Sequence, residues 1–209
     1  MSRRPVLYVL AGVNGAGKSS IGGYRLQQAG LAWFNPDSFA RELVAATGCA
    51  QTEANAEAWH EGMRRLDEAV ARRTTYAFET TLGGRTVPLR IAEASRTHDV
   101  LMWFCGLSSP EQHIARVKAR VAAGGHDIPE AKIRERYVSA FENLVALMPS
   151  IAMLQVYDNS MDVARGEAIP DPLLVAEIAD GSLAWPTDID GLRRTPEWAK
   201  PLLAAALPA

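Results

Sequence analysis

The amino-acid sequence predicts an α/β fold of three layers, in which helices cover both faces of a mainly parallel five-stranded sheet. Two observations predict it. Apolar, strand-like runs alternate with helix-like runs from residue 5 to residue 157. The first strand-like run leads directly into a glycine-rich turn and then a helix. We expect one domain over residues 1–209, with a helical lid at about 108–148 and a small C-terminal appendage at about 160–209.

Five segments have the apolar composition of strands that are buried in a sheet. They are residues 5–11, 31–35, 75–80, 99–107 and 151–157. The first of them is apolar enough throughout to be buried on both faces. Beyond these segments, the stretch LLVAEIADGSLAW predicts a hairpin that turns at Asp180-Gly181, because Asp-Gly is a preferred pair in two-residue hairpin turns.

Seven segments have helical patterns or the signals that start and stop a helix. They are residues 18–28, 35–47, 53–72, 86–97, 110–123, 130–148 and 196–207. The second segment is entered through Asn-Pro, which places Pro36 and Asp37 in its first turn. We expect Pro201 to break the last segment.

The composition is that of a globular protein, since 48% of the 209 residues are hydrophobic and 22% are charged. The net charge of −2 gives no overall positive field for nucleic acid or an anionic membrane. No run approaches the roughly 20 apolar residues of a membrane span. Cys49 and Cys105 lack the spacing of metal or redox motifs, and so few cysteines agree with a reducing cytoplasm, where we expect the protein.

The stretch GVNGAGKSS matches the phosphate-binding pattern GxxxxGK[ST] and lies between a predicted strand and a predicted helix. Glycines let the backbone turn through positive φ, so that successive N–H groups surround phosphate oxygens at the positive end of the helix. Lys18 adds a cation for the β- and γ-phosphates, and Ser19 offers a hydroxyl to Mg²⁺. The predicted nucleotide-binding residues are Gly12, Asn14, Gly15, Ala16, Gly17, Lys18, Ser19 and Ser20.

Two carboxylates lie at predicted strand ends, where open α/β sheets place their ligands. Asp37 follows the second strand and is a candidate base for an acceptor hydroxyl, although an aspartate there also suits a helix cap. Glu79 closes the third strand and needs a partner, which is Mg²⁺, its water shell, an acceptor hydroxyl or a salt bridge with Arg85. Thr80 and Thr81 either orient a substrate or are ordinary strand-end threonines.

Arginines recur in the predicted lid. Arg116 and Arg120 stand four residues apart and share one helix face, and Arg136 belongs to a polar stripe on the next helix. Guanidinium groups suit phosphate oxygens, so these residues either close over the γ-phosphate or lie on solvated faces. The loop between the helices contains Gly124-Gly125, which can hinge, and His126, a candidate contact to phosphate or substrate.

Several of these segments occur together in one order: GVNGAGKSS, NPD, FETTLGGRT, the arginine-rich stretch around GGHDIP, IRERY and YDNS. In this order they resemble the zeta toxin family of P-loop kinases, and most closely its stand-alone bacterial branch. The resemblance extends from about residue 6 to residue 160. It implies a fold like that of nucleoside and shikimate kinases. It also implies transfer of a phosphoryl group from ATP or GTP to the sugar 3′-hydroxyl of UDP-N-acetylglucosamine, with an antitoxin protein as a partner.

The resemblance also implies roles for individual residues. Lys18 matches the lysine that contacts phosphate, and Asp37 matches the catalytic base. Glu79 and Thr81 match the residues that touch the acceptor. The lid arginines that stabilise the transferred charge are matched best by Arg120 and Arg136 and less closely by Arg116 and Arg134.

The sequence therefore predicts an ATP-dependent kinase that acts on an alcohol group of a small molecule, with Mg²⁺ as cofactor. One alternative is a regulatory ATPase that binds nucleotide without a small-molecule acceptor. Another is a polynucleotide 5′-kinase, against which the nearly neutral net charge weighs. Guanine-nucleotide switches and ABC-type ATPases fit less well, because the motifs NKxD and LSGGQ are missing from the sequence.

Overall fold

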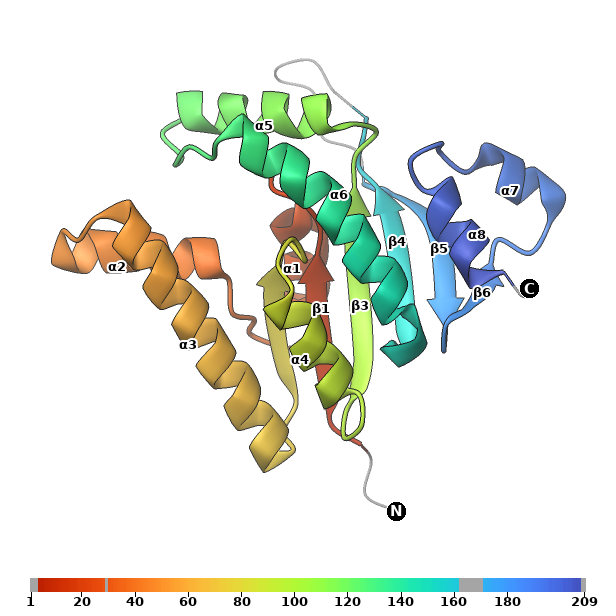
Figure 1. The fold of residues 1–209 in the computed structure, drawn as a ribbon, viewed down its shortest axis with the longest axis horizontal. Helices are drawn as coiled ribbons and strands as arrows, with labels where there is room; N and C mark the ends of the chain where they lie inside the picture. Colours follow the sequence, from red (N-terminus) through yellow and green to blue (C-terminus); the bar gives the residue numbers. More distant parts are fainter. Residues whose placement is uncertain (1–3, 29, 162–170, 208–209) are drawn as a thin grey trace.

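The computed structural model describes residues 4–28, 30–161 and 171–207, without the side chains of residues 20, 21, 24, 25 and 28. Its sheet has the strand order β2-β1-β3-β4-β5-β6 (Figure 1). The strands are β1 (Val6–Ala11), β2 (Tyr76–Thr80), β3 (Asp99–Gly106), β4 (Met153–Asp158), β5 (Leu173–Ala179) and β6 (Ser182–Trp185). The first four are parallel to one another, whereas β5 and β6 are antiparallel to their neighbours.

Helices lie on both sides of this sheet, as the alternation of the sequence predicts. In Figure 1, α4 and α6 lie in front of the sheet, α1 lies behind it, and α2 and α3 project from the β2 edge. The helices are α1 (Lys18–Gln28), α2 (Pro36–Thr47), α3 (Gln51–Arg72), α4 (Thr86–Ala94), α5 (Pro110–Ala122), α6 (Glu130–Leu147), α7 (Ile189–Arg194) and α8 (Lys200–Ala206), with a 3₁₀ turn η1 (Met148–Ser150). All seven predicted helices are found, with ends shifted by a few residues.

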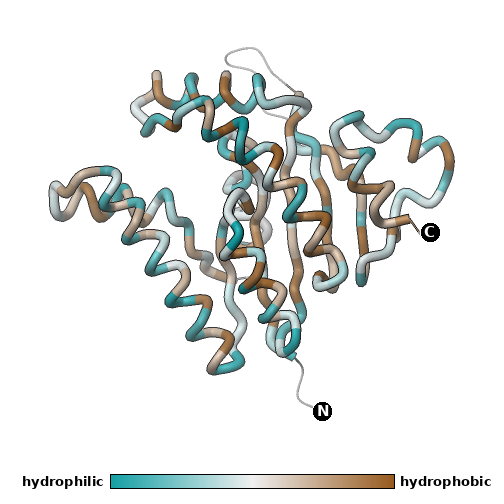
Figure 2. The backbone as a smooth tube through the Cα atoms, viewed as in Figure 1, coloured by the Kyte–Doolittle hydropathy of each residue, from teal (hydrophilic) through white to brown (hydrophobic). Residues whose placement is uncertain are grey.

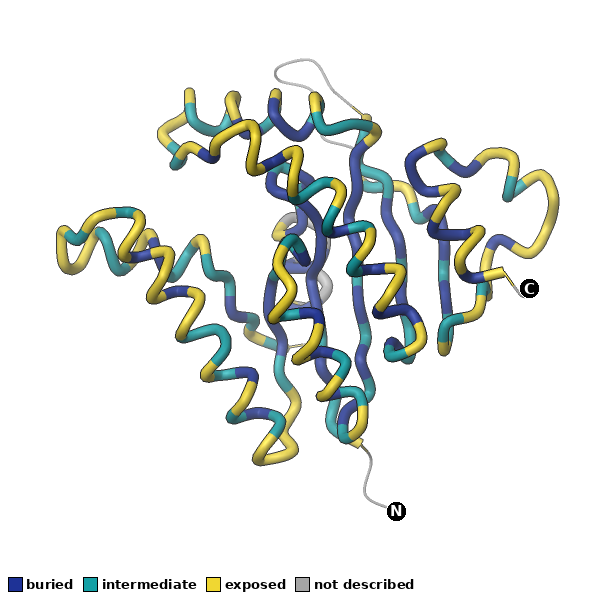
Figure 3. The backbone as a smooth tube through the Cα atoms, in the orientation of Figure 1, coloured by how far each residue is buried: buried dark blue, intermediate teal, exposed yellow. Residues whose placement is uncertain are grey.

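The strand β1, which lies between β2 and β3, is covered on both of its faces. Leu7 and Val9 are fully buried in the main core, which includes residues of α4 and α6, while Leu10 packs with Leu26 of α1 on the other face. Gly22 allows α1 to lie directly on the strand, because a Cβ atom there would overlap the Leu10 side chain. In Figure 2 the hydrophobic residues, and in Figure 3 the buried residues, are concentrated along the strands.

The predicted strand at residues 31–35 is reduced to one bridge, which corrects the sequence prediction. Phe34 pairs in parallel with Phe78 at the β2 edge, and its N–H donates to Ala77 at 2.9 Å. The pairing stops there because Asn35 caps α2 and Pro36 begins it. The short bridge nevertheless places the start of α2 directly beside the end of β2.

The C-terminal hairpin forms at Asp180-Gly181, where both residues have positive φ, of 48° and 78°, as a type I′ turn requires. It joins the main sheet instead of standing apart, since β5 pairs with β4. The described sheet therefore has six strands and not the five predicted. Pro201 lies in the first turn of α8 and does not break a helix there, because an N–H in the first turn has no intrahelical acceptor, so proline loses no hydrogen bond. The helix α7 was not predicted.

Within residues 4–28, 30–161 and 171–207, none of the helices combines the length and the apolar character needed to cross a lipid bilayer.

Candidate active site

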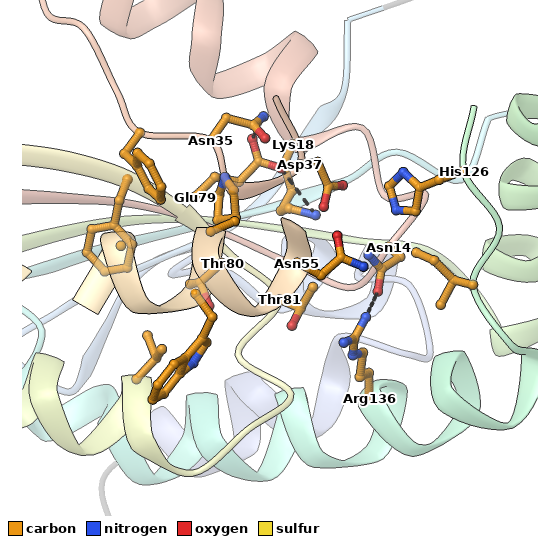
Figure 4. Close-up of a pocket in the computed structure, with 18 of the residues that line it drawn as sticks. Asn14, Lys18, Asn35, Asp37, Asn55, Glu79, Thr80, Thr81, His126 and Arg136 are labelled. Atoms are coloured by element: carbon orange, nitrogen blue, oxygen red, sulfur yellow. Dashed lines mark hydrogen bonds and ion pairs between the residues drawn. The ribbon is translucent and has the colours of Figure 1, made fainter. Parts of the chain in front are cut away.

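Most of the predicted site residues lie near the carboxyl ends of the parallel strands. Strands β1, β2, β3 and β4 are parallel, so their carboxyl ends lie at the same end of the sheet, and the glycine-rich loop leaves β1 there. Beside the loop lies a cavity of about 340 Å³. Its walls come from the loop, the start of α2, the inner side of α3, the end of β2 and the lid (Figure 4).

Three glycines of the loop have the positive φ angles that the motif predicts. The values are 140° at Gly12, 84° at Gly15 and 85° at Gly17. All three glycines also lie too close to a neighbour for a side chain, and a Cβ atom on Gly15 would lie 2.9 Å from the carbonyl oxygen of His113. A Cβ atom on Gly12 would overlap the carbonyl oxygen of Cys105, and one on Gly17 would overlap the amide of Asn159. The loop is therefore pressed against the ends of β3 and β4.

The carbonyl group of Ala16 connects the loop to those strand ends. The oxygen of Ala16 accepts a hydrogen bond from the Asn159 side-chain amide at 2.9 Å and one from the Cys105 thiol at 2.8 Å. Burial raises the pKa of Cys105 to about 12, so the thiol keeps the proton that it donates. These bonds fix the orientation of the Ala16 carbonyl, and the N–H of the same residue donates to the carbonyl of Val13 at 3.1 Å.

The lid is fastened to the loop through Asn14. Arg136 of α6 donates to the Asn14 side-chain oxygen at 2.7 Å, and His113 of α5 donates through Nδ1 to the Asn14 carbonyl at 2.8 Å. Burial lowers the pKa of His113 to about 4, so its ring is neutral at neutral pH. Burial also lowers the pKa of Arg136, against the opposing effect of the Asp37 charge. Both lid helices thus contact the nucleotide loop directly.

Lys18 and Glu79 form a buried ion pair at the foot of the loop. Their charged atoms are 3.5 Å apart, and their side chains are 8% and 10% exposed. The other carboxylate oxygen of Glu79 accepts from the Ser19 hydroxyl at 2.8 Å and from the Asn35 amide at 2.9 Å. The ionic partner of Glu79 is therefore Lys18, 61 residues away in sequence, and not Arg85, which was one of the four alternatives that the sequence left open.

Asp37 lies in the first turn of α2 and faces the same cavity as Lys18 and Glu79 (Figure 4). Its side chain is 49% exposed, and one carboxylate oxygen lies 3.9 Å from a guanidinium nitrogen of Arg120 on the lid. The helix cap that an aspartate here could provide comes instead from Asn35, whose oxygen accepts from the N–H of Ser38 at 3.0 Å. The Asp37 carboxylate is thus left available to a ligand.

The structure separates the four lid arginines. Arg136 lines the cavity, and Arg120 lies close to Asp37 and also reaches the carbonyl of His126 at 3.4 Å. Arg116 donates to the carbonyl of Met161 at 3.1 Å, beside the loop but outside the cavity. Arg134 is not brought to the cavity, because it points to the outside and pairs with Glu111 of α5 at 2.6 Å.

Four predicted site residues remain, and three of them lie at the cavity. Thr80, Thr81 and His126 line the cavity. The hydroxyls of the two threonines also accept from backbone N–H groups two residues further on, which shapes the loop after β2. The side chain of Ser20 lies outside the described part of the structure.

Comparisons with known proteins bear on the fold of the chain. No family model matches the sequence. A protein of Haemophilus influenzae, described as uncharacterized, is 27% identical over 138 residues, which are 66% of this chain and 94% of that protein.

Solved structures show the fold. A chain of the AvrRxo1-ORF1:ORF2 complex with ATP matches with a TM-score of 0.68 and 15% identity, over 100% of this chain and 66% of its own length. A chain of the PezAT toxin–antitoxin system of Streptococcus pneumoniae matches with a TM-score of 0.56 and 18% identity, over 75% of this chain and 68% of that one. A proposed kinase from Chloroflexus aurantiacus has a TM-score of 0.52 and 16% identity, over 64% of this chain and 78% of that one.

The chain shares the α/β fold of these solved structures. It spans only about two thirds of the AvrRxo1 complex chain that it matches, at 66% of that length.

One wall of the cavity is apolar. Trp59 of α3 is 47% exposed, an unusual position for a large aromatic side chain, and its surroundings are built from small and apolar residues. Gly62 gives room there, since a Cβ atom on it would lie 2.9 Å from the Phe34 ring. The apolar residues of this wall include Phe34, Ala58, Trp59, Met63, Leu66, Phe78 and Val87. The cavity therefore pairs a charged end at the P-loop with an apolar end on α3.

The residues at the foot of the P-loop fit a magnesium ion. Mg²⁺ prefers oxygen ligands, keeps several waters, and is commonly held by one or two protein groups together with substrate phosphates. The Ser19 hydroxyl and the Glu79 carboxylate already touch and lie at the start of α1, where the phosphates are expected. Among the described residues, no group of three or more His, Cys, Asp and Glu side chains could hold a metal ion without a substrate. A metal bound jointly with nucleotide phosphates is consistent with both facts.

Four residues that contribute to the candidate site were not among the predicted site residues. Asn35, Cys105, His113 and Asn159 are neutral side chains that donate hydrogen bonds to the loop or to Glu79. Asn35 and Asn159 lie in the stretches NPD and YDNS that marked the resemblance, so a signal was present for them. His113 stands alone in a helical stretch, and only the packing of α5 on the loop identifies it.

Proposed function

We propose that this chain is a magnesium-dependent kinase that transfers the γ-phosphoryl group of ATP, or of GTP, to an alcohol group of a small molecule. The observation that carries the proposal is the meeting of Lys18 and Asp37 in one cavity, although they come from different elements of the fold. A phosphate-binding lysine and a half-exposed carboxylate that face one pocket suit in-line transfer to a hydroxyl.

In this proposal the P-loop N–H groups and Lys18 hold the β- and γ-phosphates. Asp37 accepts the proton of the acceptor hydroxyl while the new O–P bond forms, and the bond from the γ-phosphorus to the bridging oxygen breaks to release ADP. Arg120 and Arg136 approach from the lid and donate to the oxygens of the transferred group. Ser19 and Glu79 hold Mg²⁺, which supplies positive charge to the phosphate oxygens when it is bound.

The cavity supports an acceptor with two different ends. The hydroxyl end belongs beside Asp37, with Thr80, Thr81 and His126 as polar contacts, and an apolar or ring-bearing end fits the wall around Trp59. UDP-N-acetylglucosamine remains the first compound to test, because of the resemblance to zeta toxins. A partner of the antitoxin type belongs to the same proposal, supported by the PezAT toxin–antitoxin system and the AvrRxo1-ORF1:ORF2 complex.

The decisive experiment compares wild-type protein with Asp37→Asn. Each is incubated with ATP, Mg²⁺ and a mixture of small-molecule alcohols that includes UDP-N-acetylglucosamine and free nucleosides, and phosphorylated products are identified by mass spectrometry. We expect kcat to fall by roughly 10²- to 10⁴-fold in Asp37→Asn, because the base is lost while the shape of the site is kept. ATP affinity, measured by calorimetry, should stay within about twofold.

Lys18→Ala serves as the contrasting variant, since it should lose ATP affinity as well as turnover. Near-normal turnover in Asp37→Asn would remove Asp37 from the role of base. If wild-type protein binds ATP but phosphorylates no compound, a regulatory ATPase replaces the kinase. Transfer to the 5′ ends of short DNA or RNA, tested in parallel, would instead support a polynucleotide kinase.

A further inference from the structure

Asn35 occupies the junction between the P-loop and α2 and uses both ends of its amide. The amide nitrogen donates to Glu79 at 2.9 Å and lies 3.3 Å from the Ser19 hydroxyl. The amide oxygen accepts from the N–H of Ser38 at 3.0 Å and caps α2. One side chain therefore contacts both proposed metal-holding groups and the helix that carries Asp37.

The backbone at this junction is fixed by the neighbouring strand. The N–H of Glu79 donates to the carbonyl of Phe34 at 2.9 Å, and Phe34 donates in turn to Ala77 at 2.9 Å. This bridge holds residue 34 in register with the end of β2, so the next residue, Asn35, is placed beside the Glu79 side chain. The contacts of Asn35 are thus a consequence of the sheet register and not of a freely rotating loop.

Three side chains fix the orientation of the Glu79 carboxylate. Lys18 attracts one oxygen of its carboxylate, and Ser19 and Asn35 both donate to the other. When a nucleotide binds, Lys18 and Ser19 are the groups that turn to phosphate and metal. Asn35 is then the donor that stays behind, because its other end remains in the α2 cap.

We propose that Asn35 is a positioning residue that orients Glu79 and Ser19 for Mg²⁺ and, through the same amide, fixes the start of α2 and so the place of Asp37. This inference rests on the proposed function, since it assumes that Mg²⁺ binds with the nucleotide. Groups that hydrogen-bond to metal ligands typically change metal affinity by 10- to 100-fold when they are removed.

The two ends of the amide can be separated by substitution. Serine is as good a helix cap as asparagine, so Asn35→Ser keeps the bond to Ser38 but is too short to reach Glu79. Asn35→Thr likewise keeps a capping hydroxyl and loses the contact to Glu79. Asp188→Ser is the matched control, because Asp188 caps α7 through the N–H of Gly191, remote in the fold from the P-loop.

The test measures binding of a fluorescent ATP analogue to the full chain over a series of Mg²⁺ concentrations, and in EDTA. For Asn35→Ser and Asn35→Thr we expect the Mg²⁺ concentration at half-maximal effect to rise by roughly 10- to 100-fold. Affinity in EDTA and the thermal midpoint of the free protein should stay close to those of wild type. Asp188→Ser should show the wild-type Mg²⁺ dependence.

An unchanged Mg²⁺ midpoint in the two Asn35 variants would overturn the inference. So would an equal loss of affinity with and without Mg²⁺, which would mean that Asn35 only supports the fold. If wild-type binding of the analogue does not depend on Mg²⁺, the inference fails while phosphoryl transfer stays testable with Asp37→Asn. Conversely, a shifted midpoint without any phosphorylated product would leave the inference standing and remove the kinase.

Discussion

At the scale of single residues, the site depends on buried polar groups that keep one protonation state. The thiol of Cys105 donates to the P-loop because burial keeps it protonated, and the ring of His113 donates to Asn14 while burial keeps it neutral. Such groups need no counter-charge, so they hold the loop without competing for phosphate.

His113 gives the protein a specific dependence on pH. Its pKa is about 4 in the fold and 6.5 ordinarily, so the unfolded chain takes up a proton at a higher pH than the folded chain does. The stability that it contributes is complete above about pH 6.5 and is lost as pH falls toward 4, at up to about 1.4 kcal/mol per pH unit. Below pH 4 this contribution changes no further.

His113→Asn should flatten that dependence, because an amide donates to Asn14 without titrating. Urea unfolding at several pH values between 4 and 8 gives the free energy of unfolding of each protein, and the difference between variant and wild type is plotted against pH. His60→Asn is the control, since His60 is exposed on α3. A difference curve for His113→Asn that is as flat as that of His60→Asn would show that the ring does not titrate in this window.

At the scale of elements, the P-loop is held from both sides. The ends of β3 and β4 press on it from below, and the lid helices α5 and α6 fasten Asn14 from above. A loop fixed in this way loses little further conformational freedom when it binds phosphate.

Gly12→Ala should disrupt this packing. Gly12 has a φ of 140°, and a Cβ atom there would overlap the backbone oxygen of Cys105, which cannot move without moving β3. We expect a loss of unfolding free energy of roughly 3 kcal/mol or more, measured by thermal or urea denaturation. Gly84→Ala is the control, because a Cβ atom there meets no neighbour within 4 Å. Equal midpoints for the two variants would contradict the expectation.

At the scale of the whole molecule, the C-terminal segment completes the core and supports the site. Trp198 lies on Gly106 at the end of β3, meets the Phe141 ring of α6 edge-on, and donates to Asp158 at 3.1 Å. Asp158 precedes Asn159, which holds the P-loop. The C-terminal segment 171–207 is thus connected to the nucleotide loop through Trp198, Asp158 and Asn159.

Trp198→Ala should therefore cost about 3–5 kcal/mol of unfolding free energy, the usual cost of removing a buried aromatic side chain. It should also weaken ATP binding in calorimetry, since Asp158 loses a hydrogen-bond donor. Trp185→Ala is the matched control, because Trp185 is 41% exposed, and its change in stability should be much smaller. Equal stability losses would mean that the tail is an independent appendage.

Local signals in the sequence account for most of the elements. The spacing of Gly12, Gly17 and Lys18 identifies the phosphate loop, and the Asn-Pro pair before Asp37 marks the start of α2. The segment 31–35 has a strand-like composition, but its pairing is limited to Phe34 by the helix that follows. Composition alone cannot show how many residues of an edge segment reach a neighbouring strand.

By itself, the sequence determined the alternation of strands and helices, the phosphate-binding loop and the presence of a carboxylate after the next strand-like segment. These depend on contacts between residues that are close in the chain. Only the tertiary structure decided that Glu79 pairs with Lys18, that Arg136 faces the cavity while Arg134 faces outward, and that the hairpin extends the sheet. The physical reason is that these outcomes depend on sheet register and on the rotation of a helix against its neighbours, which few local residues specify.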